Sequence, residues 1–222
     1  MWRRLLADGS WTHVVDVGAN YGEMLANGGL PPGARVLALE PNPRICSYLK
    51  QTLSESGIMA EIFPVAVSDT VGRAELLVDR ASSGTTRLAR REDVASAAAL
   101  EKHEVPTTTL AALLRDEGPL GSIHALVKID VEGHEIPVLR GILEILDHLG
   151  SFVALVEILH LAAADVAWLV SQFDVEVYDR EADRLLSVLP ATSYRLAGML
   201  AAGNIYPNDV VVRRKAHCQC PL

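Results

Sequence analysis

A glycine turn flanked by carboxylates is the part of this 222-residue sequence whose residue types most directly suggest chemistry. Residues 14–22 begin with β-branched apolar residues, pass through Asp16 and reach Gly18 and Gly22. Such a run is typical of a buried strand that enters a tight turn, where Gly18 lets the backbone approach a ligand and Gly22 lets the next helix pack closely. A second apolar run ends in Glu40, whose carboxylate can accept hydrogen bonds from two ribose hydroxyls. This order predicts the nucleoside-binding half of a doubly wound α/β sheet.

The spacing within this turn separates two kinds of nucleoside cofactor. A dinucleotide turn requires the pattern G-x-G-x-x-G, but the positions after Gly18 that should be glycine hold Asn20 and Glu23. Glu23 would lie near a helix N-terminus, where it would repel a pyrophosphate. A cofactor with a cationic centre and no phosphate, such as S-adenosylmethionine, fits better, with Asp16 orienting the turn and the amino-acid end and Glu40 holding the ribose. The alternative is a strand-to-helix turn with an incidental pair of glycines.

Titratable groups are also dense in residues 128–135, at the end of a later apolar run. Asp130 closes this predicted strand and is expected to point toward the cofactor cleft, because ligands bind outside the carboxyl ends of the strands in such sheets. The alternative is a helix-capping region, in which Glu132 and Glu135 favour the positive end of the helix dipole and His134 is exposed. We favour the capping role for the two glutamates and a functional role for Asp130.

A second acidic strand end lies at Glu157, and His160 follows three residues later. If the strands that end at Asp130 and Glu157 are neighbours, both carboxylates reach the same crevice and form a candidate magnesium site. The alternative is that His160 only caps or packs near a strand end.

Methyl transfer from a sulfonium to an oxygen requires an aligned acceptor and help in losing its proton. His134 is the first candidate for the general base and His160 the second, because imidazole titrates near neutral pH. A metal held by Asp130 and Glu157 would be an alternative, since it could lower the pKa of the acceptor hydroxyl. The sequence leaves this choice open.

Apolar runs alternate with helix-like segments along most of the chain, which predicts a parallel sheet covered on both faces by helices. The expected strands are residues 13–17, 35–39, 62–67, 73–78, 105–108, 125–130, 152–157, 175–178 and 210–213. Helices are expected from near residue 21, over residues 43–56, after a cap at Thr108 or Thr109, and over residues 134–148. A further, alanine-rich helix is expected after residue 157. The polar segment 81–104 is predicted to be a lid or substrate loop, and residues 215–222 a flexible tail.

Composition limits the classes of protein to which the chain can belong. Half of the residues are apolar, so one domain over residues 1–222 can bury a substantial core. The net charge of −8 argues against a nucleic-acid partner. No apolar stretch approaches the length of a membrane span, and three cysteines suggest no disulfide framework. We therefore predict a cytoplasmic protein.

Several of these motifs, taken together, resemble the FkbM family of S-adenosylmethionine-dependent methyltransferases. The resemblance covers residues 14–160 approximately, and the block 128–135 is its most specific part. The motifs are VDVGANYG at 15–22, LEPNP at 39–43, AVSD at 66–69 with Gly72, VPTTTL at 105–110, LVKIDVEGHE at 126–135, LRG at 139–141 and VE at 156–157.

The resemblance implies a class I methyltransferase fold, with a Rossmann-like seven-stranded sheet that is mostly parallel and has an antiparallel last strand. It also implies that Ser68 or Asp69 lies near the adenine and Asp130 near the methionine end or a metal. Members commonly carry a longer segment before the glycine turn, so an amino-terminal cap over the cleft is expected to be missing or to come from another subunit. The residues expected to contact the cofactor are Asp16, Gly18, Ala19, Asn20, Tyr21, Gly22, Glu40, Pro41, Asn42, Ser68, Asp69 and Asp130.

The sequence thus predicts an O-methyltransferase that uses S-adenosylmethionine and methylates a hydroxyl of a sugar or small natural product. A carboxyl, nitrogen or peptide acceptor is the nearest alternative. A short-chain nicotinamide-dependent oxidoreductase would need a Tyr-x-x-x-Lys pair, which none of the five tyrosines supplies. A non-catalytic cofactor-binding protein is a third alternative. The expected partner is a small-molecule acceptor, with no nucleic acid or membrane, and the oligomeric state is left open.

Overall fold

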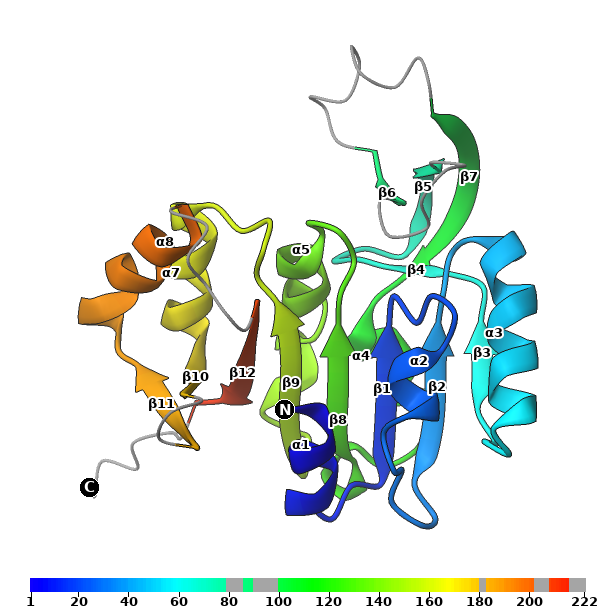
Figure 1. The fold of residues 1–222 in the computed structure, drawn as a ribbon, viewed down its shortest axis with the longest axis horizontal. Helices are drawn as coiled ribbons and strands as arrows, with labels where there is room; N and C mark the ends of the chain where they lie inside the picture. Colours follow the sequence, from blue (N-terminus) through cyan, green and yellow to red (C-terminus); the bar gives the residue numbers. More distant parts are fainter. Residues whose placement is uncertain (79–85, 90–99, 180–182, 202–207, 216–222) are drawn as a thin grey trace.

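The computed structural model describes residues 1–78, 86–89, 100–179, 183–201 and 208–215. Their main element is an eight-stranded sheet in the order β11-β10-β12-β9-β8-β1-β2-β3 (Figure 1). In chain order these strands are β1 His13–Val17, β2 Arg35–Leu39, β3 Glu61–Phe63, β8 His124–Ile129, β9 Ser151–Glu157, β10 Phe173–Asp179, β11 Arg184–Val188 and β12 Asp209–Arg214.

The sheet is parallel from β3 to β9 and antiparallel beyond it. Strands β3, β2, β1, β8 and β9 pair in parallel, whereas β12 is antiparallel to both β9 and β10. The expected antiparallel last strand is therefore confirmed. The expected number of seven strands is wrong, because β11 pairs with β10 and adds an eighth strand at the edge.

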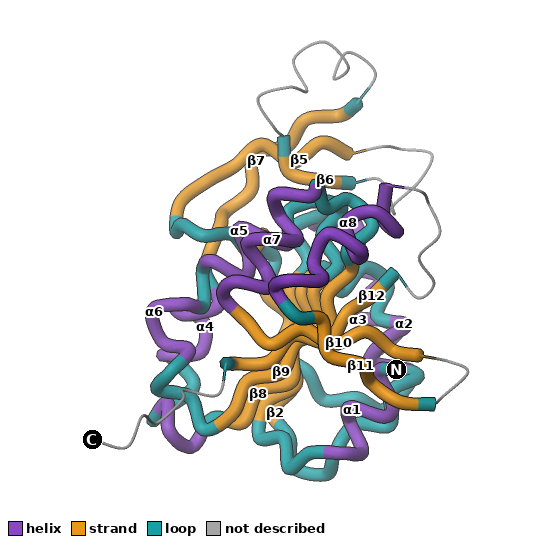
Figure 2. The backbone as a smooth tube through the Cα atoms, turned by 90° about the vertical axis from the view of Figure 1, so that its left-hand side faces the viewer, coloured by secondary structure: helices purple, strands orange, loops and turns teal. Residues whose placement is uncertain are grey.

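Helices cover both faces of the sheet, as a doubly wound α/β fold requires. Alternate residues of each central strand point to opposite faces, so that Val14 and Leu126 join one buried cluster while Val15 and Val127 join the other. Figure 2 shows the resulting three layers from the side. One face carries α1 Trp2–Asp8, α2 Glu23–Ala26 and α3 Pro43–Glu55, and the other carries α4 Leu110–Arg115, α5 Glu135–Arg140, α6 Leu143–Leu146, α7 Ala163–Gln172 and α8 Ser193–Ala201.

A second, smaller sheet rises above the carboxyl ends of the central strands (Figure 1). Its order is β4-β7-β5-β6, formed by Ala66–Val67, Glu101–Thr108, Gly72–Val78 and Arg87–Leu88. The prediction of one strand over 62–67 is wrong, because Pro64 has no amide hydrogen to donate and the chain turns there, from β3 in the main sheet to β4 in the small one. Within the segment 81–104, predicted to be a lid or substrate loop, the structure has strand β6 and the start of β7. Residues 81–85 and 90–99 lie outside the described residues.

The predicted helix over 134–148 is divided into α5 and α6. At the break, a Cβ on Gly141 would lie 2.4 Å from the carbonyl oxygen of Ser68. The glycine therefore lets the end of α5 approach the backbone after β4. By contrast, the predicted cap at Thr109 is confirmed, because its Oγ1 accepts a hydrogen bond of 3.0 Å from the amide of Ala112.

The two ends of the chain also depart from expectation in part. Helix α1 was not predicted, and its buried Trp2, Leu5 and Leu6 pack in the same cluster as Val14. Of the predicted tail, Lys215 is described, with its Nζ donating to the carbonyl oxygen of Ser171 at 2.6 Å, and residues 216–222 lie outside the described part. None of the described helices has the length and apolar character needed to cross a bilayer.

The turn after β1 depends on Gly18. This residue has φ of 78°, in the left-handed region, and a Cβ there would lie 2.0 Å from the carbonyl oxygen of Asp130. We expected the absence of a side chain at Gly18 to make room for a ligand. In the structure, it makes room for the backbone of Asp130, directly after β8. Gly22, with φ of 87°, is packed as expected, since a Cβ there would meet the Leu49 side chain on α3 at 2.8 Å.

We expect Gly18→Ala to reduce the free energy of unfolding by about 2 kcal/mol more than Gly57→Ala, the scale of an overpacked core site. Gly57 is a matched control because it has φ of 68° but no atom within 4 Å of the position that an added Cβ would take, so its replacement costs only the left-handed conformation. Urea denaturation of both variants measures the difference. Equal losses would contradict the close approach of Asp130.

Candidate active site

A cavity of about 460 Å³ lies at the carboxyl ends of the central strands, beneath the small sheet. This volume is in the range of small-molecule and cofactor sites. The ends of β1, β2, β8 and β9 form its floor, and β4, β5 and β6 contribute one wall. Its polar and charged lining residues include Asn20, Glu23, Glu40, Thr86, Arg87, Lys128, Asp130, Glu132, His134, Glu157, Asn208 and Asp209.

The Glu40 carboxylate is held in place by the glycine turn. Its Oε2 accepts a hydrogen bond of 3.0 Å from the amide of Asn20, and its Oε1 accepts one of 2.9 Å from the amide of Asn42. Burial raises the pKa of Glu40, while the two amides act in the opposite direction. Each oxygen keeps a lone-pair site for another donor, so the carboxylate is fixed and ready to accept hydroxyl groups from the cavity.

Lys128 links the two acidic residues at the ends of β1 and β8. Its Nζ lies 2.9 Å from Oδ2 of Asp130 and 3.9 Å from Oδ1 of Asp16. Asp16 is 1% exposed, and neither of its carboxylate oxygens has a hydrogen-bond partner among the described residues. Burial raises the pKa of Asp16 and Lys128 opposes this. For Lys128, burial disfavours the charged form, but Asp16 and Asp130 outweigh it and raise the lysine pKa.

The structure brings about half of the predicted cofactor-binding residues to the cavity. Those that line it are Gly18, Ala19, Asn20, Glu40, Pro41 and Asp130.

The other predicted cofactor-binding residues do not line the cavity. Asp16 is buried next to Lys128. The Tyr21 ring packs edge-on against the Tyr48 ring, with 5.8 Å between the ring centroids. Asn42 caps α3 by accepting a 3.0 Å hydrogen bond from the amide of Arg44, while Gly22, Ser68 and Asp69 also lie outside the lining.

His134 lines the cavity and is held by the residues after β4. Its Nε2 lies 2.9 Å from Oγ of Ser68, and that hydroxyl donates to Oδ1 of Asp69 at 3.2 Å. With its single proton given to Asp69, the Ser68 hydroxyl can only accept at its contact with Nε2 of His134. Ser68 and Asp69 therefore orient His134.

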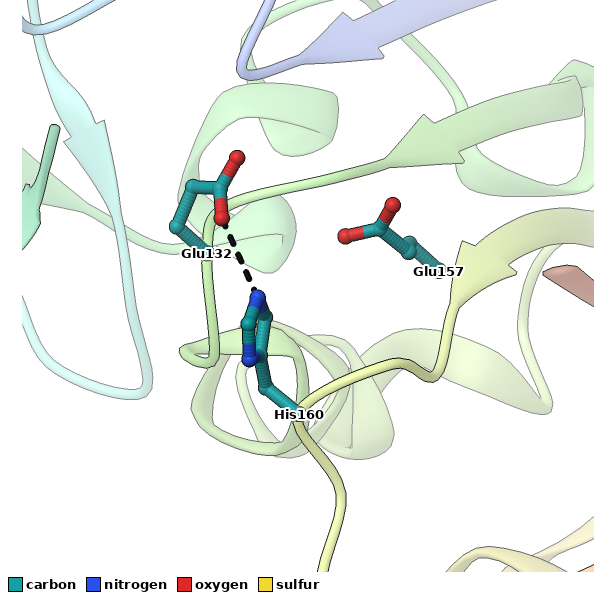
Figure 3. A group of neighbouring side chains, drawn as sticks. All are labelled: Glu132, Glu157 and His160. Atoms are coloured by element: carbon teal, nitrogen blue, oxygen red, sulfur yellow. Dashed lines mark hydrogen bonds and ion pairs between the residues drawn. The ribbon is translucent and has the colours of Figure 1, made fainter. Parts of the chain in front are cut away.

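A third group gathers Glu132, Glu157 and His160 (Figure 3). Oε2 of Glu132 lies 3.2 Å from Nε2 of His160. Burial raises the pKa of Glu157 to about 8, and the neighbouring carboxylates Asp130, Glu132, Glu135 and Asp209 add to that rise. Burial also raises the pKa of Glu132, while His160 opposes it. The cavity thus has an acidic end opposite Glu40.

The sequence predicted the roles of the residues at this acidic end only in part. Glu135 has the structural role we favoured, because its Oε1 accepts from the amides of Val131 and Gly133 at 3.2 and 2.9 Å. Glu132 instead faces His160. Asp209 was missed, although its place at the start of the antiparallel strand puts it opposite Glu157 in the sheet, a position that strand topology could have indicated.

Comparison with known proteins identifies the class to which this fold and cavity belong. The model of the methyltransferase FkbM domain matches residues 16–196. The chain therefore belongs to the FkbM methyltransferase family, and the predicted relationship to this family of S-adenosylmethionine-dependent enzymes is confirmed. No curated protein matches the sequence.

Three of the solved structures that resemble the chain illustrate how distant the likeness is. A precorrin-6y C5,15-methyltransferase from Geobacter metallireducens has 13% identity and a TM-score of 0.46, covering 97% of this chain and 86% of that one. A putative O-methyltransferase from Klebsiella pneumoniae has 9% identity and a TM-score of 0.49, covering 97% and 78%. The O-methyltransferase TomG from Streptomyces achromogenes has 11% identity and a TM-score of 0.44, again covering 97% and 78%.

The acidic end of the cavity predicts a pH dependence of stability. Because the pKa of Glu157 rises from 4.5 to about 8 on folding, its contribution is present below pH 4.5 and is lost as the pH rises through 8. Glu157→Gln removes this dependence. We therefore expect the Tm of the variant, relative to that of the unmodified chain, to increase between pH 5 and pH 8.5 in a chelator-containing buffer.

Thermal unfolding at several pH values measures this difference. Glu55→Gln, at an exposed position on α3, is the control and should show a constant difference in Tm. A constant difference for Glu157→Gln as well would contradict the crowding of carboxylates at this end of the cavity.

Proposed function

We propose that this chain is a single-domain methyltransferase that transfers the methyl group of S-adenosylmethionine to a hydroxyl of a sugar or small natural product. The observation that carries the proposal is the Glu40 carboxylate, fixed by two backbone amides at the end of β2 and facing the same cavity as the glycine turn. That arrangement supports a nucleoside ribose at Glu40.

The rest of the cavity suits the remaining parts of the cofactor. Pro41, Ile45 and Val65 provide an apolar region next to Glu40 for the adenine ring. On the other side, the turn at Gly18 leads toward Asp130, where acidic side chains favour a sulfonium and an α-amino group. The methyl group would then point toward the acidic end and the small sheet, which contributes Arg87 and Leu88 to the wall.

The reaction would be an in-line displacement at the methyl carbon. The acceptor oxygen forms the new bond to carbon as the carbon–sulfur bond breaks, and its proton passes to a base, so the products are a methyl ether and S-adenosylhomocysteine. His134 is our first candidate for the base, because its ring lines the cavity and is held there by Ser68. His160 is the second candidate, and assistance by a divalent cation is the alternative to both.

The choice of acceptor rests on the family resemblance. A carboxyl, nitrogen or peptide acceptor is the nearest alternative, and a non-catalytic cofactor-binding protein is the other. We do not retain the oxidoreductase alternative, because the chain belongs to a methyltransferase family. From composition we further propose a cytoplasmic location and a small-molecule partner rather than nucleic acid or membrane.

Binding of S-adenosylhomocysteine tests the cofactor and the role of Glu40. We expect Glu40→Gln to weaken binding by about 1 to 3 kcal/mol, the scale of a lost charged hydrogen-bond acceptor, whereas Glu55→Gln should have no effect. Isothermal titration calorimetry gives the affinities, and thermal unfolding checks that the variant is folded. Failure of the unmodified chain to bind would refute the cofactor assignment, and an unchanged affinity in Glu40→Gln would remove Glu40 from the ribose site.

A methyl-transfer screen against glycosides and hydroxylated metabolites tests the reaction. With the acceptor that it identifies, His134→Gln should lower kcat by about 100-fold or more, the contribution of a general base, and leave the affinity for S-adenosylhomocysteine unchanged. A kcat within about threefold of the unmodified enzyme would exclude His134 as the base. His148→Gln, at an exposed position after α6, is the matched control.

A further inference from the structure

We propose that Glu132, Glu157 and His160 together bind a divalent cation at the acidic end of the cavity. The sequence suggested Asp130 and Glu157 as the metal ligands, and the structure favours a different set. The cation site itself needs no cofactor, but its use in methyl transfer rests on the proposed function.

The geometry of the three side chains is the first argument. Glu132 lies in the turn after β8, Glu157 ends β9, and His160 lies between β9 and α7, so that three separate positions of the chain converge (Figure 3). One ligand atom from each lies within 4.8 Å of the other two.

These separations are close to those of a bound cation. Ligands about 2.1 Å from a cation are about 3.0 Å apart when adjacent and about 4.2 Å apart when opposite. The 3.2 Å between Glu132 and His160 suits an adjacent pair. The other two separations are within 4.8 Å, and the long glutamate side chains can adjust them through changes in their torsion angles.

The charges around Glu157 are the second argument. Its side chain is partly buried and makes no hydrogen bond or ion pair with a donor in the described part of the chain, whereas Asp130, Glu135 and Asp209 all act on it as like charges. Partly buried carboxylates in such a group need either protons or a cation. A divalent cation would supply the missing positive charge at the point where the carboxylates converge.

Two of the neighbouring acidic groups, Asp130 and Glu135, already have partners, which explains why they are not in our ligand set. An oxygen of Asp130 is 2.9 Å from Nζ of Lys128. Glu135 uses its Oε1 to accept two backbone amides in the turn after β8.

The ligand set also indicates the kind of cation. Carboxylates suit Mg²⁺ and Mn²⁺, and an imidazole ligand shifts the preference toward the transition metal. Three protein ligands leave positions for water or for an acceptor oxygen. Glu132 and Glu157 line the cavity, so an acceptor hydroxyl that enters it can replace one of these waters. Its pKa would then fall and its attack on the methyl carbon would be favoured.

Titration of the metal-free protein with Mn²⁺ alone, followed by electron paramagnetic resonance, tests the site. We expect the unmodified chain to bind one Mn²⁺ with Kd below about 1 mM, and Mg²⁺ to compete. His160→Ala and Glu157→Gln should each weaken binding about tenfold or more. His103→Ala is the matched control, because His103 forms a similar ion pair with Glu101 on β7, at 3.1 Å, and its removal should leave the affinity unchanged.

The spectrum of the bound ion separates a ligand from a structural residue. Electron spin echo envelope modulation should show coupling between Mn²⁺ and a nitrogen nucleus in the unmodified chain and lose it in His160→Ala. The proposal is overturned if no Mn²⁺ binds at about 1 mM, if the nitrogen coupling is absent, or if both variants bind as tightly as the unmodified chain. Glu157→Gln provides the test of affinity if His160→Ala does not fold.

Failure of this proposal is distinguishable from failure of the proposed function, because the titration contains neither S-adenosylmethionine nor an acceptor. A chain that binds S-adenosylhomocysteine but not Mn²⁺ would retain its cofactor assignment and lose the cation site. A chain that binds Mn²⁺ but not S-adenosylhomocysteine would retain the cation site and lose its proposed role in methyl transfer.

Discussion

The carbonyl oxygen of Asp130 occupies the space that a side chain at position 18 would need. This contact joins the turn after β1 to the end of β8, and the amide of Asp130 adds a 3.2 Å hydrogen bond to the carbonyl oxygen of Val17. On the other side of the same turn, the amides of Gly18 and Ala19 both donate to the carbonyl oxygen of Leu39, each at 3.0 Å. Three strand ends are thereby fixed relative to one another, and the cavity is built upon them.

Charge is distributed unevenly over this framework. At one end, Glu40 receives two backbone amides and remains a fixed acceptor. In the middle, Lys128 joins Asp16 and Asp130, which keeps a buried carboxylate next to a buried ammonium. At the other end, Glu132 and Glu157 face each other beside His160. Buried ion pairs add little to stability, and the acidic end is the part of this arrangement that suits the cationic groups of the proposed function.

The sequence was most informative where local pattern and function coincide. Strands 13–17 and 35–39 and the start of α3 at Pro43 agree with the structure, because apolar runs, turn residues and a proline in the first helical turn act over short distances. The break at Gly141 could not be predicted, since it depends on which distant backbone lies alongside, whereas Pro64 was a local signal that the predicted strand 62–67 is divided. The partly exposed edge strand β11 carries little periodic signal.

The candidate site shows the same contrast between features set by local sequence and features set by tertiary structure. Glu40 and Gly18 could be found from spacing alone, whereas the grouping of Glu132 with His160 required the turn after β8, in which Glu132 itself has φ of 52°. No sequence pattern gives the direction of a side chain from such a turn. The contacts of Ser68 with Asp69 and His134 likewise depend on tertiary structure, which places residues 68 and 134 side by side.

A crystal structure of the protein with S-adenosylhomocysteine tests the central claim most directly, namely that the fixed Glu40 carboxylate and the turn at Gly18 form the nucleoside site. We predict both ribose hydroxyl oxygens within about 3 Å of the Glu40 carboxylate, with the amino-acid end extending past Gly18 toward Asp130. A ligand whose ribose lies away from Glu40, or which occupies another part of the surface, would contradict the account.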